Sequence, residues 1–218
     1  MALTAGPAGL RWRVHAVLPR SRANGPGVRY TVWVQGCSLA CTGCFNPATH
    51  PSGTGVPVPV RDTAAAVLAG AAGIDGVTLT GGEPLQQPAA VAEFCARLRA
   101  RTDLGIIVLT GFTRREIEAD PARLAAVAAA DLVVAGRYDR RRQLAAGLRG
   151  SANKAYWART DRYRPADLAG TPETELLLAP DGTVTVTGTA AATGLVHALA
   201  GPPAGGPDGP DRPDRSGR

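Results

Sequence analysis

The order of apolar and polar side chains predicts strands and helices that alternate along most of the chain. Residues 12–18 and 28–35 alternate apolar and polar positions in the manner of half-buried strands. Farther along, short apolar runs predict buried strands, and longer stretches with helical spacing predict helices between them. The predicted strands are 76–80, 104–109 and 132–134, and the predicted helices are 61–72 (N-cap Asp62 or Thr63), 88–101 and a segment that ends near 130.

This alternation favours an α/β fold with a parallel sheet and crossover helices. In such sheets the functional site lies beyond the carboxyl ends of the strands. Several segments directly follow predicted strands, and we expect them to gather at one rim of the sheet. They are 36–46, 81–84, 110–112 and 136–138.

Other parts of the chain show different patterns. Residues 51–59 are rich in proline and glycine and predict a connector. Two apolar runs flank Pro180, Asp181 and Gly182, which is the pattern of a β-hairpin. Residues 201–218 hold many Pro, Gly, Asp and Arg and are expected to be disordered. The predicted organisation is a leader at 1–10, a main domain at 11–157, an extension with a β-hairpin at 158–200, and a tail at 201–218.

Composition limits the classes of function. The chain lacks the long apolar run of a membrane span and the basic start of a secretory signal, so we expect a cytoplasmic protein without a membrane partner. The net charge is +6, but nearly all basic residues are arginine, and Lys154 is the only lysine. This arginine bias, in a chain with so much Ala, Gly and Pro, weakens a nucleic-acid interpretation of the basic charge, so a nucleic-acid partner is not expected. The densest arginine cluster, between residues 137 and 149, could be a solvated face or a docking surface for an acidic partner.

Three of the four cysteines, Cys37, Cys41 and Cys44, lie in one short segment with C-x3-C-x2-C spacing. Thiolates this close can converge on one inorganic centre. A cubane iron–sulfur cluster normally takes four cysteines, so three would leave one iron open to chelate a small molecule. A structural zinc site is the alternative, and it would need a fourth ligand such as Cys95 or His50. Cys95 falls on the apolar face of a predicted helix, however, and is expected to be a core thiol.

The turn at Gly81 and Gly82 lies after a predicted strand and downstream of the cysteines. Glycine allows close backbone approach, so backbone groups here could hold the methionine part of S-adenosylmethionine. The amine and carboxylate of that molecule could chelate the open iron, and an electron from the cluster could then cleave it. Taken alone, two consecutive glycines are equally typical of a tight turn between a strand and a helix.

The cysteine motif, followed by a strand that ends in Gly-Gly-Glu-Pro, resembles the radical S-adenosylmethionine superfamily. The sequence most resembles the activating enzymes of anaerobic ribonucleotide reductase, which are glycyl-radical activases. This resemblance covers about residues 10–157. The segments that carry it, in the same order as in that family, are 24–29, 43–46, 110–112, 132–138 and 149–153.

The resemblance implies a partial (β/α) barrel of the radical S-adenosylmethionine type, here with a short C-terminal β extension. It implies that Cys37, Cys41 and Cys44 ligate a [4Fe-4S] cluster. The expected contacts to S-adenosylmethionine are Gly43, Cys44, Phe45, Gly81, Gly82 and Glu83. No catalytic residue beyond these ligands is expected.

The implied activity is that of a radical enzyme, an oxidoreductase that cleaves S-adenosylmethionine reductively to a 5′-deoxyadenosyl radical. The expected partner is a glycyl-radical enzyme such as anaerobic ribonucleoside-triphosphate reductase, and flavodoxin or ferredoxin would donate the electron. The chain departs from the family at His50 and Ala135, where tryptophan and aspartate are frequent, and in the segment 158–200. Two alternatives therefore stay open, which are radical modification of a peptide or small molecule and a zinc-stabilised binding module without catalysis.

Overall fold

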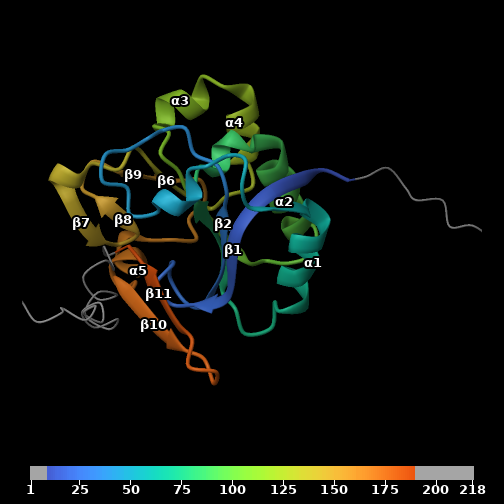
Figure 1. Cartoon of the computed structure of the whole chain (residues 1–218). Helices are drawn as coiled ribbons and strands as arrows, with labels where there is room; N and C mark the ends of the chain where they lie inside the picture. The colour runs from blue at the N-terminus through green and yellow to red at the C-terminus, as the bar shows by residue number, and fades with distance from the viewer. Residues whose placement is uncertain (1–8, 190–218) are drawn as a thin grey trace, which may run out of the picture.

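The computed structural model describes residues 9–189. The expected leader, apart from its last two residues, and the expected tail lie outside this range. The described residues form an α/β fold around a mixed, mostly parallel sheet (Figure 1). None of the helices in the described part has the length and apolar character to cross a membrane.

The central sheet has seven strands in the order β3-β1-β2-β4-β5-β6-β9. The predicted parallel strands form its middle, with register pairs such as Tyr30 with Val77 and Val77 with Ile106. They are buried on both faces, as the apolar runs at 76–80, 104–109 and 132–134 predict. The alternation at 28–35 predicted a half-buried strand instead, and this was wrong, because Arg29 and Thr31 are fully buried too. These strands are β2 (Arg29–Val34), β4 (Gly76–Gly81), β5 (Gly105–Leu109) and β6 (Leu132–Ala135).

Antiparallel strands flank this middle on both sides. Strand β1 (Arg11–Ser21) pairs with β2, and β9 (Ala155–Ala158) pairs with β6. The prediction of a connector at 51–59 was wrong for β3 (Val56–Pro59), which pairs with the start of β1. Two prolines obscure this strand in the sequence, but an edge strand tolerates proline because one side needs no hydrogen bonds.

The helices lie where the periodicity predicts them, and the second helix packs against both the first and the fourth. The cap prediction for α1 was wrong, because the helix begins at Val60 after Pro59, without a side-chain cap. Thr63 is buried instead, and its hydroxyl accepts a hydrogen bond from the Trp12 indole at 3.1 Å. The helices are α1 (Val60–Ala69), α2 (Pro88–Arg99), α3 (Arg114–Glu118) and α4 (Pro121–Ala126), with 3-10 turns η1 (Pro47–Thr49), η2 (Pro84–Gln86) and η3 (Arg140–Arg142).

The main core lies between the sheet and these helices. On α2, Val91, Phe94, Cys95 and Leu98 are all fully buried, so the predicted core position of Cys95 is confirmed. Burial raises the pKa of the Cys95 thiol to about 12, which keeps it neutral. Cys95 is therefore a packing residue.

A smaller cluster covers the other face of the sheet. Leu148 and Leu168 pack there against Ile107, Leu132 and Val134. The segment after residue 157 thus packs on the same sheet as the main domain. The elements on this side are β7 (Gln143–Ala146), β8 (Arg149–Ser151) and α5 (Pro165–Ala169).

The predicted hairpin is confirmed as β10 (Thr174–Leu178) paired with β11 (Val184–Gly188). Contacts with the turn after β1 hold it against the body of the protein. The Glu175 carboxylate accepts hydrogen bonds from the Ser21 hydroxyl at 2.7 Å and the Arg22 N–H at 2.8 Å. The Thr187 hydroxyl accepts one from the Asn24 amide at 2.8 Å.

Candidate functional site

A cavity lies at the carboxyl ends of the parallel strands, where the sequence predicts the site. Loops that follow β2, β4, β5 and β6 all contribute to it, so the expected gathering of these segments is confirmed. Its lining includes Cys37, Cys41, Cys44, Phe45, Gly81, Gly82, Glu83, Thr110, Gly111, Tyr138, Leu148, Gly150, Lys154, Gly188 and Thr189.

The cysteine loop is fixed at its base by backbone hydrogen bonds. The Gly36 N–H donates to the Thr49 oxygen at 2.8 Å, and the Cys37 N–H donates to the His50 oxygen at 3.0 Å. His50 thus supports the loop through its backbone. Within the loop, the Cys44 N–H closes a turn onto the Cys41 oxygen at 3.1 Å. This arrangement presents the loop side chains to the cavity.

The three loop cysteines are free, partly exposed thiols. Burial raises the pKa of the Cys37 thiol, and the nearby Glu83, Cys41 and Cys44 add to this rise, while the Leu39 N–H opposes it. Among residues 9–189, no three His, Cys, Asp or Glu side chains are grouped closely enough to hold a single metal ion. Ligation of a centre by these cysteines therefore stays a prediction.

The donor set nevertheless fits a cluster that takes three protein ligands. All three thiols line one cavity, and each remains accessible from it. Cys95 is not among the lining residues and lies in the main core. The cavity therefore offers soft thiolate ligands from the loop alone.

The glycine turn after β4 packs tightly against the base of the cysteine loop. A Cβ atom on Gly81 would lie 2.6 Å from the Val34 nitrogen, and one on Gly82 would lie 2.4 Å from the Gly36 oxygen. The Glu83 N–H donates to the same Gly36 oxygen at 2.9 Å. Glycine is thus required here by contact between the two loops, whatever ligand the cavity holds.

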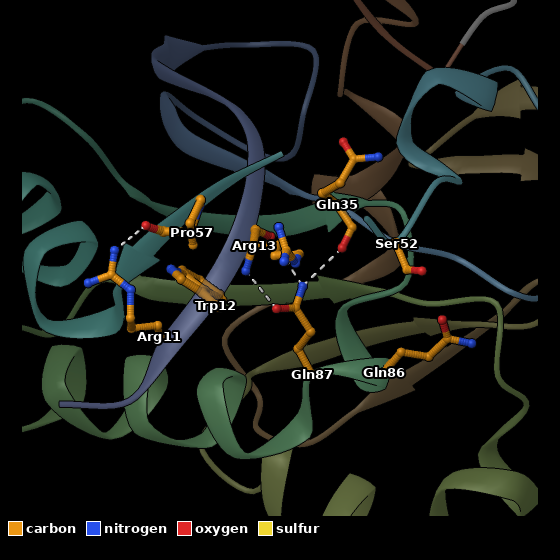
Figure 2. Close-up of a pocket in the computed structure, with 9 residues that line it drawn as sticks. Arg11, Trp12, Arg13, Gln35, Ser52, Pro57, Gln86 and Gln87 are labelled. Carbon is orange, nitrogen blue, oxygen red and sulfur yellow. Dashed lines mark hydrogen bonds between the residues drawn. The ribbon is translucent and has the colours of Figure 1, made fainter. Parts of the chain in front are cut away.

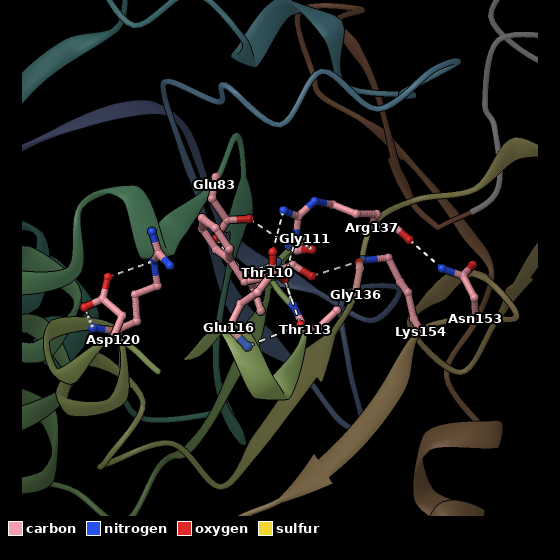
Figure 3. Close-up of polar contacts among 12 residues, drawn as sticks. Glu83, Thr110, Gly111, Thr113, Glu116, Asp120, Gly136, Arg137, Asn153 and Lys154 are labelled. Carbon is pink, nitrogen blue, oxygen red and sulfur yellow. Dashed lines mark hydrogen bonds and ion pairs between the residues drawn. The ribbon is translucent and has the colours of Figure 1, made fainter. Parts of the chain in front are cut away.

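The Glu83 side chain is 1% exposed and is surrounded by hydrogen-bond donors of the protein itself. Its carboxylate accepts from the Thr110 hydroxyl at 2.7 Å, the Gly111 N–H at 2.7 Å and the Leu85 N–H at 2.9 Å. Burial raises the pKa of Glu83, and these hydrogen bonds oppose the rise. The side chain therefore links the rim of β4 to the rim of β5 (Figure 3).

The remaining predicted contacts differ in position. Phe45 lines the cavity and meets Tyr138 edge to face, with ring centroids 5.4 Å apart. Gly43 does not line the cavity, and a Cβ atom there would lie 2.8 Å from Arg140 Cδ. A contact from Gly43 to S-adenosylmethionine stays a prediction. Tyr138 lies in the segment 136–138 that was expected at the rim, and Gly150 lies in a segment that carries the family resemblance, but sequence reasoning named neither of them as a ligand contact.

Lys154 is a charged lining residue that the sequence analysis did not assign to the site. Its ammonium donates to the Gly136 oxygen at 2.5 Å and to the Thr110 oxygen at 3.2 Å (Figure 3). Burial lowers the pKa of Lys154, and the negative charge of Glu83 opposes this effect. An ammonium has three N–H donors, so within residues 9–189 one remains after these two contacts. The one feature of the sequence that could have drawn attention to Lys154 is that it is the only lysine of the chain.

An ion pair supports the rim from outside the cavity (Figure 3). The Arg137 guanidinium contacts both carboxylate oxygens of Glu116 at 2.9 Å and donates to the Gly111 oxygen at 2.5 Å. Glu116 also closes the capping box of α3 with Thr113. The pair therefore fixes Gly111, whose N–H holds Glu83.

A second hollow lies over the start of β1, between Arg11, Pro57 and Ser52 (Figure 2). The Gln87 amide spans two strands there, because it accepts from the Arg13 N–H at 2.7 Å and donates to the Gln35 oxygen at 3.1 Å. None of the predicted ligand residues lines this hollow. Its polar groups serve to join η2 to the sheet.

Comparison with known proteins places the chain in a family. The model of the 4Fe-4S single cluster domain matches residues 23–157, which is more than half of the chain. The anaerobic ribonucleoside-triphosphate reductase-activating protein of Vibrio cholerae is 32% identical over 155 residues, which cover 64% of this chain and 94% of the relative. The protein of the same name from Enterobacteria phage T4 is 29% identical over 151 residues, covering 66% and 93%.

A second group of relatives matches over a shorter length. The pyruvate formate-lyase-activating enzyme of Listeria monocytogenes is 39% identical over 93 residues, and the match covers 40% of this chain and only 37% of that enzyme. These findings confirm the predicted resemblance to radical S-adenosylmethionine activases and support the cofactors that it implies. The chain belongs to the family of 4Fe-4S single cluster domains and resembles the activases of glycyl-radical enzymes.

Proposed function

We propose that this protein is a radical S-adenosylmethionine enzyme that installs a glycyl radical on a partner enzyme. The observation that carries the proposal is one cavity that joins Cys37, Cys41 and Cys44 to the Gly-Gly-Glu turn, in a chain of the 4Fe-4S single cluster family. The fold proposed for it is a partial (β/α) barrel. The parallel order β2-β4-β5-β6, with helices in each crossover, supports this assignment.

When bound and reduced, the [4Fe-4S] cluster would supply one electron that splits S-adenosylmethionine into methionine and a 5′-deoxyadenosyl radical able to take the α-hydrogen of a glycine. The residues of the chain bind, orient and shield. Cys37, Cys41 and Cys44 would hold the cluster. The contacts proposed for S-adenosylmethionine are Gly43, Cys44, Phe45, Gly81, Gly82 and Glu83.

Lys154 would hold the carboxylate of S-adenosylmethionine. Its ammonium lines the cavity and keeps one N–H donor beyond those given to Thr110 and Gly136. A charged hydrogen bond to a carboxylate in a partly buried site is stronger than a neutral one. Glu83 and Arg137 would act on the ligand indirectly, because they fix the rim residue Gly111.

The partner proposed is a glycyl-radical enzyme such as anaerobic ribonucleoside-triphosphate reductase, which the names of the relatives favour. Flavodoxin or ferredoxin is the proposed electron donor, and the cytoplasm is the proposed location. Arg140, Arg141 and Arg142 are exposed beside the cysteine loop, where a Cβ on Gly43 would touch Arg140. Such a positive surface suits an acidic partner, and its effect should weaken as salt rises.

Anaerobic reconstitution followed by reduction with dithionite tests the proposal. The protein should bind about four irons per chain, as a cubane requires, and should convert S-adenosylmethionine to 5′-deoxyadenosine. Adding a glycyl-radical reductase should produce a persistent electron paramagnetic resonance doublet. A colourless protein with bound zinc and no 5′-deoxyadenosine would instead identify a zinc-stabilised binding module. Formation of 5′-deoxyadenosine without the doublet, across candidate reductases, would favour a peptide or small-molecule substrate.

A further inference from the structure

We propose that a groove between β1 and β11 binds an extended, glycine-containing segment of the radical acceptor as an added β-strand. One wall of this groove is residues 15–18 of β1, and the other is residues 185–187 of β11. The inference rests on the proposed function, because it concerns how an acceptor reaches the same cavity. Figure 1 shows the hairpin beside β1.

Both walls include an unpaired strand edge. Four consecutive residues of β1 and three of β11 border the hollow, whereas the side chains on one face of a strand would contribute only alternate residues. Strand β3 pairs with β1 from Arg11 to Val14, and in the described part of the chain no strand continues this pairing. Strand β11 likewise pairs only with β10 among the described strands. Unpaired edges offer rows of N–H and C=O groups, and an extended peptide can bind to them by strand addition.

The groove adjoins the cavity of the cysteines. Phe45, Asn46 and Trp33 border both hollows. Beside the cavity, the Asn24 amide donates to the Thr187 hydroxyl at 2.8 Å and ties the second wall to the turn after β1. Gly188 and Thr189, which follow the groove wall, also line that cavity. A chain in the groove would therefore pass beside Phe45 into the site.

The chemistry of the groove suits a peptide backbone. Its described lining side chains are neutral hydroxyl, amide and apolar groups together with His15, and none of them is a carboxylate or a guanidinium. Recognition would then depend on main-chain hydrogen bonds, which tolerate varied side chains. Glycine suits the end of such a segment, because it presents its α-carbon without a side chain.

The second wall of the groove is absent from the matched family domain. That match ends at residue 157, whereas β11 begins at Val184. The phage T4 relative is covered over 93% of its length by an alignment that reaches only 66% of this chain. The groove thus belongs to the part of this chain that these comparisons do not match.

A binding experiment with a synthetic probe tests the groove. The probe is a short fluorescent peptide of alternating valine and threonine around a central glycine, added to the reconstituted protein with S-adenosylmethionine. Thr185→Trp fills the groove, and Val184→Trp is its control, because Val184 is 46% exposed and is not a lining residue. The affinity for the peptide, measured by fluorescence anisotropy, should fall about tenfold or more in Thr185→Trp, which corresponds to the loss of one or two hydrogen bonds. In Val184→Trp the affinity should change by less than about twofold.

A modified peptide provides a test that needs no variant. Methylation of alternate backbone nitrogens removes the donors that strand addition requires, so this peptide should not bind. Equal binding of the two peptides, no binding to the wild type, or unchanged affinity in Thr185→Trp would each overturn the inference. A wild-type dimer that Thr185→Trp dissociates would also overturn it, because a second copy would then occupy the groove.

The outcome is separable from that of the proposed function. Wild-type protein that forms 5′-deoxyadenosine but does not bind the peptide keeps the radical activity and overturns the groove assignment. Protein that binds the peptide in the Thr185-dependent manner but forms no 5′-deoxyadenosine keeps the peptide site and overturns its link to radical chemistry.

Discussion

A buried arginine and a half-buried lysine lie at opposite ends of the parallel strands of the sheet, and they use their donors differently. Arg29, at the start of β2, donates to the Thr78 and Tyr163 hydroxyls and to the backbone oxygens of Val77, Gly105 and Pro26. All five N–H groups of a guanidinium are thereby used. Lys154, beyond the ends of β5 and β6, makes two such contacts and keeps one donor.

The difference separates a structural end of the sheet from a binding end. Burial lowers the pKa of both groups, so burial alone does not distinguish them. At the amino end, Tyr163 from the segment after β9 completes the shell around Arg29. At the carboxyl end, free thiols, glycines and a spare donor border a cavity. Unused hydrogen-bonding and ligating capacity, rather than burial, marks the site.

The largest expected effect is the loss of iron when a loop cysteine at the binding end of the sheet is substituted. Cys41→Ser should lose most of the iron after anaerobic reconstitution, because a cluster cannot be held by the two remaining thiolates. Iron and sulfide per chain are the measurement. The matched control is Cys95→Ala, which removes a core thiol and should keep the iron content. Equal loss in both variants would refute the assignment of the loop cysteines.

Next in size is the effect of removing the guanidinium at the structural end. Arg29→Met removes the buried donors to the Thr78 hydroxyl and to the Val77 and Gly105 oxygens. A lost hydrogen bond from a charged group costs about 1.5–3 kcal/mol, so the unfolding free energy should fall by about 3 kcal/mol or more. Urea unfolding of the cluster-free protein measures this. Arg61→Met, which removes an exposed pair with Asp62, should change stability by less than about 1 kcal/mol. A similar loss in both variants would break the comparison.

The spare donor of Lys154 predicts an intermediate effect. In Lys154→Met the affinity of the reconstituted protein for S-adenosylmethionine should fall about tenfold, the loss of one charged hydrogen bond. Equilibrium dialysis measures it without turnover. Arg115→Met removes an exposed charge on α3 and should leave the affinity unchanged. Unchanged affinity in Lys154→Met would mean that Lys154, like Arg29, is structural.

The smallest effect concerns the ion pair at the outer rim. Hydrogen bonds from Arg137 and from the Thr113 N–H lower the pKa of Glu116 to about 2, from an ordinary value of 4.5. A lowered carboxyl pKa stabilises the fold above pH 4.5, and this contribution is lost as pH falls from about 4.5 towards about 2. Because Glu116 is 39% exposed, solvent screening should keep the contribution below about 1 kcal/mol.

The measurement compares unfolding free energies of the wild type and Glu116→Gln. The difference between them should be present at neutral pH and shrink below the ordinary pKa of 4.5. Glu118→Gln is the control, since Glu118 pairs with Arg114 but takes no part in the capping box. A difference that grows in acid would contradict the predicted sign.

Local patterns in the sequence determined much of this protein. Apolar runs predicted β4, β5 and β6, because parallel strands buried on both faces are largely apolar, and alternation predicted β2. Helical spacing placed Cys95 in the core of α2. The order of strands and loops then placed the cysteines and the glycine turn at one rim, since parallel strands share their carboxyl ends.

Contacts between distant segments were decided only by the tertiary structure. Periodicity carries no information on pairing across the chain, so β3, β9 and the groove beside β11 were not predicted. The same holds for the Glu83 carboxylate, which meets donors on β5 and its loop, and for Gly82, which is glycine because the Gly36 oxygen lies against it. Lys154 became a site residue only when β9 brought it over the ends of β5 and β6, where backbone oxygens and the cavity surround one ammonium.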